Sequence, residues 1–105
     1  MFTHSQSVER SLYCPNCEST GCVFINITSG EAVYDNVPFA VARGIVFCEH
    51  CGLSISECRG KIQINPMDPF GDVRAKNTMF TGIRDQLIQN WNEYVAWSRN
   101  NVLVE

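Results

Sequence analysis

The chain of 105 residues has no long apolar run and no leader-like start. No apolar stretch approaches the roughly 20 residues that a membrane span needs, so a transmembrane segment is not expected. Residues 1–6 hold no basic region followed by an apolar stretch, which is the pattern of a secretory signal peptide. These absences predict a cytoplasmic protein.

The chain also carries little charge. Its formal net charge is −3, from 8 Lys and Arg against 11 Asp and Glu. This balance disfavours sequence-independent nucleic-acid binding, which depends on neutralising phosphates. It is also too weak for a mimic of DNA, which needs a dense acidic surface. A local basic face stays open as an alternative to a solvated surface, because the bases gather late in the chain, at Arg59, Lys61, Arg74, Lys76 and Arg84.

No catalytic pattern stands out. The sequence shows no Ser-His-Asp order, no paired-carboxylate signature and no glycine-rich phosphate loop. It also contains no internal repeat and no low-complexity tract. We therefore expect a protein that is not an enzyme.

The feature that the chain does have is cysteine, with 6 in all. Four of them form two Cys-x-x-Cys pairs, Cys14 with Cys17 and Cys48 with Cys51, which 30 residues separate. A two-residue spacing lets one tight turn present both sulfurs to a single ion, and two such turns supply the four ligands of a tetrahedral zinc site. Gly52 suits the sharp turn after the second pair, whereas Glu18 follows the first pair.

Redox chemistry is the main alternative for such pairs. In thioredoxin-like enzymes the motif opens a helix of a βαβ unit, whereas here turn residues follow both pairs. Disulfides or unpaired core thiols are a further alternative, which the absence of an export signal disfavours. We expect Zn²⁺ as the cofactor, although iron in a four-thiolate site gives the same pattern. A shell closed by four thiolates leaves no open position for catalysis.

Two further cysteines, Cys22 and Cys58, lie outside the pairs. Buried thiols pack as small hydrophobic groups, and this is the preferred interpretation. Replacement of a paired sulfur by Cys22, Cys58 or His50 is the alternative.

The residue pattern predicts an α+β fold, a small antiparallel zinc-ribbon sheet with two knuckles and a C-terminal helix packed on it. We expect one domain over 1–105, with residues 1–12 as a mobile or loosely docked lead-in. Strands are predicted at 23–28, 41–47 and 61–64. A further strand at 32–37 is predicted to follow a turn at 29–31 and to stop at Pro38. Residues 65–77 hold two prolines and a glycine and are predicted as an inserted loop, in which Phe70 either anchors on the core, the preferred interpretation, or is an exposed contact.

The last predicted element is an amphipathic helix, which Thr81 is expected to cap. Apolar residues recur at helical spacing, at Ile83, Leu87, Ile88, Trp91, Tyr94 and Val95. The simplest interpretation packs this stripe on the sheet, and the alternative is a helix that binds a partner groove. The apolar tail at 102–104 could dock or dimerise.

Three segments together resemble the Lar restriction-alleviation family of phage and prophage proteins. They are Cys14-Pro15-Asn16-Cys17, Cys48-Glu49-His50-Cys51-Gly52 and Gln86-Leu87-Ile88-Gln89-Asn90-Trp91-Asn92. The resemblance implies a tryptophan packed over the zinc-bearing sheet, and Glu18 departs from it, because the family tends to have glycine there.

By the same resemblance, the protein would be phage-encoded, reside in the host cytoplasm and bind a host defence complex. We expect Phe70, Arg74 and Lys76 to contact that complex. The alternative function is a nucleic-acid-binding zinc ribbon that assists transcription or replication. It requires Arg59, Lys61, Arg74 and Lys76 to converge on one face with Phe70.

Overall fold

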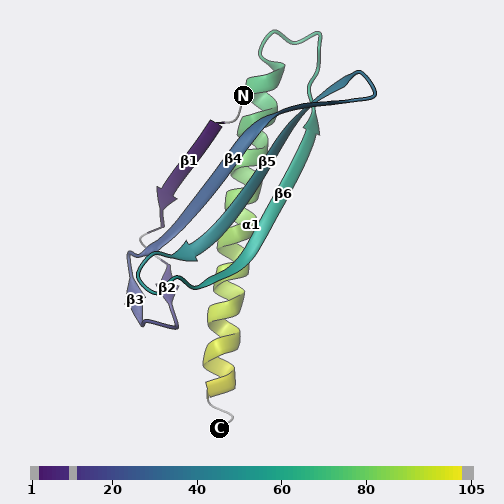
Figure 1. The fold of residues 1–105 in the computed structure, drawn as a ribbon. Coiled ribbons are helices and arrows are strands. Elements are labelled where there is room, and N and C mark those ends of the chain that lie inside the picture. Colours follow the sequence, from purple (N-terminus) through teal and green to yellow (C-terminus); the bar gives the residue numbers. More distant parts are fainter. Residues whose placement is uncertain (1–2, 10–11, 103–105) are drawn as a thin grey trace.

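The structure, a computed structural model, describes residues 3–9 and 12–102 (Figure 1). Four antiparallel strands form the main sheet in the order β1-β4-β5-β6, a second sheet pairs β2 with β3, and helix α1 lies across one face of the main sheet. This confirms the predicted α+β fold. The elements are β1 (Thr3–Val8), β2 (Tyr13–Cys14), β3 (Ser19–Thr20), β4 (Val23–Tyr34), β5 (Val37–Cys48), β6 (Ser54–Gln63) and α1 (Gly71–Val102).

The long hairpin of β4 and β5 is the centre of the sheet. Its register runs from Val23 opposite Cys48 to Tyr34 opposite Val37. The turn lies at Asp35 and Asn36, whose φ angles of 50° and 63° suit a turn that follows the twist of the strands. The turn predicted at 29–31 is therefore wrong. Residues 29–31 continue β4. The strand predicted to stop at Pro38 instead ends at Tyr34, and Pro38 belongs to β5.

The N-terminal segment is a strand rather than a mobile lead-in. Residues 3–8 form β1, an edge strand paired with β4. Directly after it, Glu9 is buried, and its carboxylate accepts hydrogen bonds of 2.8 and 2.9 Å from the guanidinium of Arg84 in α1. The prediction of a mobile or loosely docked lead-in is wrong for residues 3–9, because backbone pairing and this ion pair hold a polar segment that has no apolar periodicity. Residues 1–2 and 10–11 lie outside the described part.

Helix α1 begins ten residues before the predicted cap at Thr81. The Asp68 carboxylate accepts a hydrogen bond of 3.0 Å from the backbone N–H of Phe70, just before the first turn. Because residues 71–77 belong to α1, the loop predicted over 65–77 is wrong for this part. Although α1 has 32 residues, no stretch in the described part of the chain is a helix apolar enough to cross a membrane.

The apolar stripe of α1 packs on the sheet as predicted. Ile83, Leu87, Trp91 and Val95 are buried, and Ile88 and Tyr94 are half-buried. The stripe extends towards the helix start, where Ala75 and Met79 continue the four-residue spacing. The strands contribute the alternate residues that face α1, namely Val23, Ile25, Ile27, Ala40, Ala42 and Val46. The tail at 102–104 lies outside the described residues, except for the backbone of Val102.

Gly44 sets how closely α1 approaches the sheet, and its replacement is the first testable prediction. A Cβ at this position would lie 2.5 Å from Cγ2 of Ile83 and 3.0 Å from Cδ1 of Leu87. Gly44→Ala is therefore expected to cost about 1–3 kcal/mol of unfolding free energy, as overpacking of a core does. Urea denaturation of the zinc-loaded protein measures this.

The matched control is Gly82→Ala in the exposed part of α1. A Cβ there meets nothing within 4 Å, so the better helix propensity of alanine should stabilise the protein by about 1 kcal/mol. Equal effects of the two substitutions would contradict the close packing at Gly44.

Candidate metal centre

Two tight turns bring the cysteine pairs together at one end of the main sheet. Cys14 ends β2 and Cys17 lies in the turn between β2 and β3, while Cys48 ends β5 and Cys51 lies in the turn before β6. The small sheet of β2 and β3 lies beside the end of β5 (Figure 1). In the second turn, the N–H of Gly52 donates to the carbonyl of Cys48 at 2.8 Å, with Gly52 at a φ of 78°. The chain thus places sulfurs far apart in sequence around one point.

The spacing of the four sulfurs fits a metal ion rather than disulfides. The Sγ atoms of Cys14 and Cys51 are 3.6 Å apart, as are those of Cys17 and Cys48, and all four lie within 4.8 Å of one another. A tetrahedral site with Zn–S bonds of about 2.3 Å has sulfur–sulfur edges of about 3.8 Å, whereas a disulfide bond is about 2.05 Å long. The four cysteines could therefore hold a metal ion.

The surroundings of the sulfurs favour different protonation states. Burial raises the pKa of the Cys14 thiol to about 12, although the N–H groups of Cys17 and Asn16 oppose this. The Asn16 side chain, followed by the N–H of Leu53, lowers the pKa of Cys51 to about 6. The Ser19 side chain lowers the pKa of Cys17. Metal binding at this centre must therefore displace the proton of Cys14.

A fifth cysteine lies against the centre, which the preferred interpretation from sequence did not anticipate. The Sγ of Cys22 is 3.4 Å from the Sγ of Cys48, although Cys22 is not one of the four mutually close ligands. Its signal in the sequence is its position directly before β4, whose first residue pairs with Cys48. Among the described residues, the exposed His50 and the half-buried Cys58 do not join the ligand group.

Trp91 connects α1 to the first knuckle, which is the turn that carries Cys14 and Cys17. Its indole is fully buried, and Nε1 donates a hydrogen bond of 2.7 Å to the carbonyl of Tyr13, the residue before Cys14. Arg99 adds a cation–π contact, with its guanidinium carbon 5.4 Å from the centre of the Tyr13 ring. The helix therefore fixes the strand that presents Cys14.

Glu18 provides the second prediction, because it has a φ of 57°, in the left-handed region. Gly52 takes the same region at the matching place after Cys51. Glu18→Gly is expected to raise the unfolding free energy by about 1 kcal/mol, since only glycine adopts this conformation without cost. The measurement is urea denaturation of the zinc-loaded protein.

Glu49→Gly is the control, at a turn position without positive φ. It should lower the stability by about 0.5–1 kcal/mol, because glycine loses more freedom on folding. If both substitutions destabilise equally, the left-handed strain at Glu18 is not what limits the first knuckle.

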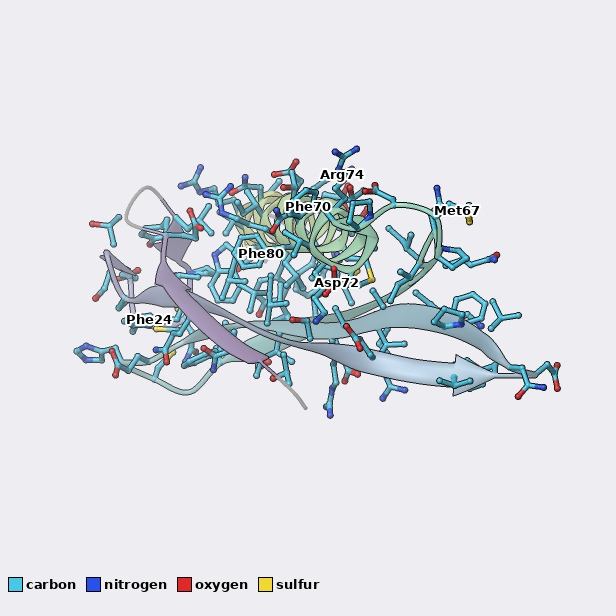
Figure 2. All side chains as sticks on the ribbon, turned by 90° about the horizontal axis from the view of Figure 1, so that it is seen from above. Phe24, Met67, Phe70, Asp72, Arg74 and Phe80 are labelled. Carbon is cyan, nitrogen blue, oxygen red and sulfur yellow. The ribbon has the colours of Figure 1, made fainter. Side chains whose placement is uncertain are left out.

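The residues predicted to bind a partner lie at the other end of the molecule. Phe70 is 62 % exposed, so the preferred interpretation of it as a core anchor is wrong. Arg74 pairs with Asp68 at 3.4 Å and Lys76 with Glu31 at 3.3 Å. Phe70 and Arg74 lie on the helix side of the molecule (Figure 2).

The basic residues do not converge as the nucleic-acid alternative required. Arg59 and Lys61 belong to β6, and their side chains lie on the face of the sheet away from α1. Arg74 and Lys76 belong to α1 itself. The convergence of these four residues around Phe70, which that alternative required, is therefore not found.

Comparison with protein-family models, with curated proteins and with solved structures found no match for this chain.

Proposed function

We propose that the chain is a zinc-stabilised binding protein without enzymatic activity. The observation that carries this proposal is the group of four sulfurs within 4.8 Å of one another. Four thiolates fill a tetrahedral shell and leave no position at which a water or a substrate could be activated. Zn²⁺ would therefore fix the two knuckles and the sheet end, and the rest of the surface would do the binding.

The biological role that we propose is counter-defence of the Lar type, in the cytoplasm of a phage host. Its support is the resemblance of the two cysteine pairs and of Trp91-Asn92. The family tryptophan is expected to pack over the zinc-bearing sheet, and the burial of Trp91 with its bond to Tyr13 agrees with this. The partner would be a host protein complex of a restriction-like defence.

The surface proposed for this partner is the loop patch, made of Met67, Phe70 and Val73. These side chains are 87 %, 62 % and 49 % exposed. Met67 and Phe70 lie between β6 and α1 (Figure 2), and Val73 lies in the first turn of α1. Methionine and aromatic side chains are enriched at protein interfaces, and a central aromatic residue often supplies most of the binding energy. Phe70 would be that residue, with Arg74 one helical turn away, where its N–H donates a hydrogen bond of 3.0 Å to the Phe70 carbonyl.

The test is capture of the partner from host lysate. Zinc-loaded protein, immobilised and treated with nuclease, should retain a defence complex that mass spectrometry identifies. Phe70→Ala should weaken this capture by about 30-fold, the loss expected for an interface hot spot. The matched control is Val33→Ala, which truncates an exposed apolar side chain at the hairpin tip and should leave capture unchanged.

Failure to retain any defence complex after nuclease treatment would refute the proposed role. Equal capture by the wild type and Phe70→Ala would refute the loop patch as its surface.

A further inference from the structure

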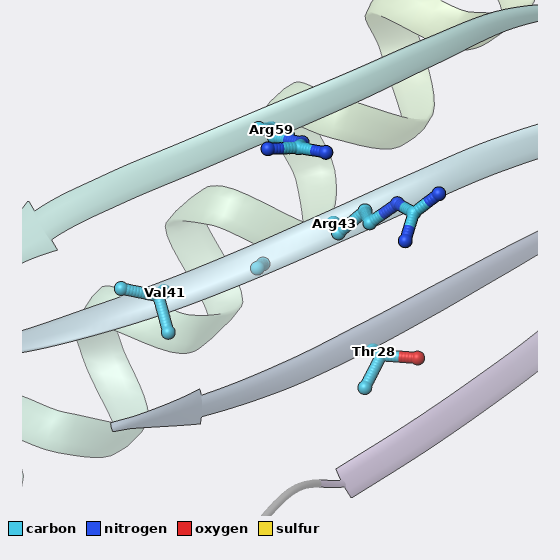
Figure 3. Close-up of a pocket in the computed structure, with 5 residues that line it drawn as sticks. Thr28, Val41, Arg43 and Arg59 are labelled. Atoms are coloured by element: carbon cyan, nitrogen blue, oxygen red, sulfur yellow. The ribbon is translucent and has the colours of Figure 1, made fainter. Parts of the chain in front are cut away.

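The main sheet has a second face, which no helix covers within the described residues. Along β5 the residues that face α1 alternate with Val41, Arg43, Ile45 and Phe47, which point the other way. The register places Thr28 of β4 and Arg59 of β6 on either side of Arg43. Figure 3 shows Thr28, Val41, Arg43 and Arg59 in front of the strands, with α1 behind them. We call this surface of β4, β5 and β6 the open face.

The open face is basic although the whole chain is acidic. The side chains of Arg43 and Arg59 are 60 % and 74 % exposed, and Lys61 follows on the same side of β6. Among the described residues of these three strands, the carboxylate on this face is Glu57, held at 2.9 and 2.8 Å by the two arginines. The three cations thus outnumber the carboxylate, whereas the chain as a whole carries a charge of −3. This part of the surface attracts anions.

Aromatic rings lie at both ends of this basic strip. Phe24 and Phe47 are register partners whose stacked rings have centres 5.9 Å apart. At the other end, the rings of Tyr34 and Phe39 are 5.6 Å apart, and the ammonium of Lys61 lies 5.0 and 4.9 Å from their centres. Phe39 and Phe47 are eight residues apart in β5, which corresponds to about 26 Å along an extended strand. The strip therefore offers rings and cations along one path.

The middle of the strip is hollowed. The side chains of Thr28, Val41, Arg43 and Arg59 line a hollow of about 450 Å³ (Figure 3). A second one, of about 210 Å³, shares Thr28 and Arg43 and is also lined by Asn26 and Ile45. Within the described part of the chain, Oδ1 of Asn26 is buried without a hydrogen-bond partner. An unsatisfied acceptor that shares a hollow with Arg43 suits a ligand that carries both donors and negative charge.

We propose that the open face binds single-stranded nucleic acid. Unpaired bases stack on aromatic rings at the surface of a sheet, and Arg or Lys side chains follow the phosphates. Tyr34 is exposed, and Phe24, Phe39 and Phe47 are half-buried. A duplex keeps its bases stacked inside, and an acidic peptide has no bases to match the rings. Stacking tolerates any base, so the binding has little sequence preference. This activity is separate from the proposed protein contact, because the loop patch lies on the helix side.

The experiment is a fluorescence anisotropy titration of labelled oligothymidine and oligouridine, each of about 12 nucleotides, with the zinc-loaded full chain. Binding is expected at protein concentrations up to about 100 µM in low salt. Three neutralised phosphates predict an affinity loss of about 20-fold between about 50 and 200 mM salt. The DNA and RNA probes differ in the 2′-hydroxyl, and their comparison shows which strand is preferred.

Paired variants locate the site. Arg43→Gln with Arg59→Gln should weaken binding about 10-fold or more and flatten the salt dependence. Phe47→Leu, which keeps an apolar side chain, should weaken it by about 5- to 10-fold through lost stacking. Arg74→Gln with Lys76→Gln removes the same charge from α1 and should leave the affinity unchanged. The melting curve of each zinc-loaded variant confirms that it is folded.

Three results would overturn the proposal. The first is no anisotropy change with either probe up to about 100 µM protein in low salt. The second is an equal loss of affinity in the two charge variants. The third is a dimer in sedimentation that Arg43→Gln with Arg59→Gln makes monomeric while neither probe binds, since this would assign the open face to a second copy of the chain.

Discussion

Cys14→Ser and Cys51→Ser are each expected to leave the chain unfolded at 25 °C, so that heating shows no cooperative unfolding transition. Structural zinc contributes about 10–16 kcal/mol of apparent folding free energy in small peptides, as much as the whole stability of about 5–15 kcal/mol of a typical domain. Both sulfurs belong to the mutually close group of four, so either substitution opens the shell. Circular dichroism during thermal unfolding, with and without added zinc, measures the effect.

Cys58→Ser is the control for these variants. Cys58 is half-buried in β6 and does not belong to the ligand group among the described residues. Its replacement should leave zinc content unchanged and shift the unfolding free energy by no more than about 1–2 kcal/mol. Melting curves of Cys14→Ser and Cys51→Ser that match the wild type would remove the basis for a structural metal.

Trp91→Ala is expected to cost about 3–5 kcal/mol of unfolding free energy, the range for truncating a buried aromatic residue. Trp91 is fully buried at the level of the first knuckle, and its indole N–H is bonded to Tyr13. The variant should also retain zinc less tightly, because the strand that presents Cys14 loses its hydrogen bond and packing to α1. Urea denaturation and a zinc-release assay with a competing chelator measure both effects.

Trp91→Phe separates the hydrogen bond from the packing. It keeps most of the apolar volume and should lose less than Trp91→Ala, with about 1 kcal/mol from the missing hydrogen bond. If Trp91→Ala left stability intact and abolished partner capture instead, Trp91 would belong to an interface and not to the core.

The metal centre was predictable because its information is local. Two residues between paired cysteines fix a turn, and the chemistry of thiolates fixes the ligand number. The helix face was predictable for the same reason, since Ile83, Leu87 and Trp91 repeat with the helical period.

The parts that sequence reasoning missed depend on tertiary contacts. Residues 71–82 include Asn, Thr and Gly, which are weak helix formers. This first part of α1 is nevertheless helical, because Ala75 and Met79 pack on the sheet. The turn of the hairpin lies at Asp35-Asn36 and not at 29–31, because Gly30 fits the long strand opposite Val41. The polar strand β1 is set by pairing with β4 and by Glu9 with Arg84.

The positive charge of the open face likewise depends on tertiary contacts and could not be predicted from composition. Arg43, Arg59 and Lys61 come from two strands, and their common surface follows from the register of β5 with β6. Composition gave only a net charge of −3. The separation of a basic strip from the remaining acidic surface requires the topology.

X-ray absorption spectroscopy at the zinc edge, on protein purified with its native metal, tests the central claim most directly. The account predicts one zinc per chain with a shell of four sulfurs at about 2.3 Å, from Cys14, Cys17, Cys48 and Cys51. A shell with nitrogen or oxygen ligands, a chain that holds iron instead, or a chain without metal and with these cysteines in disulfides would contradict it.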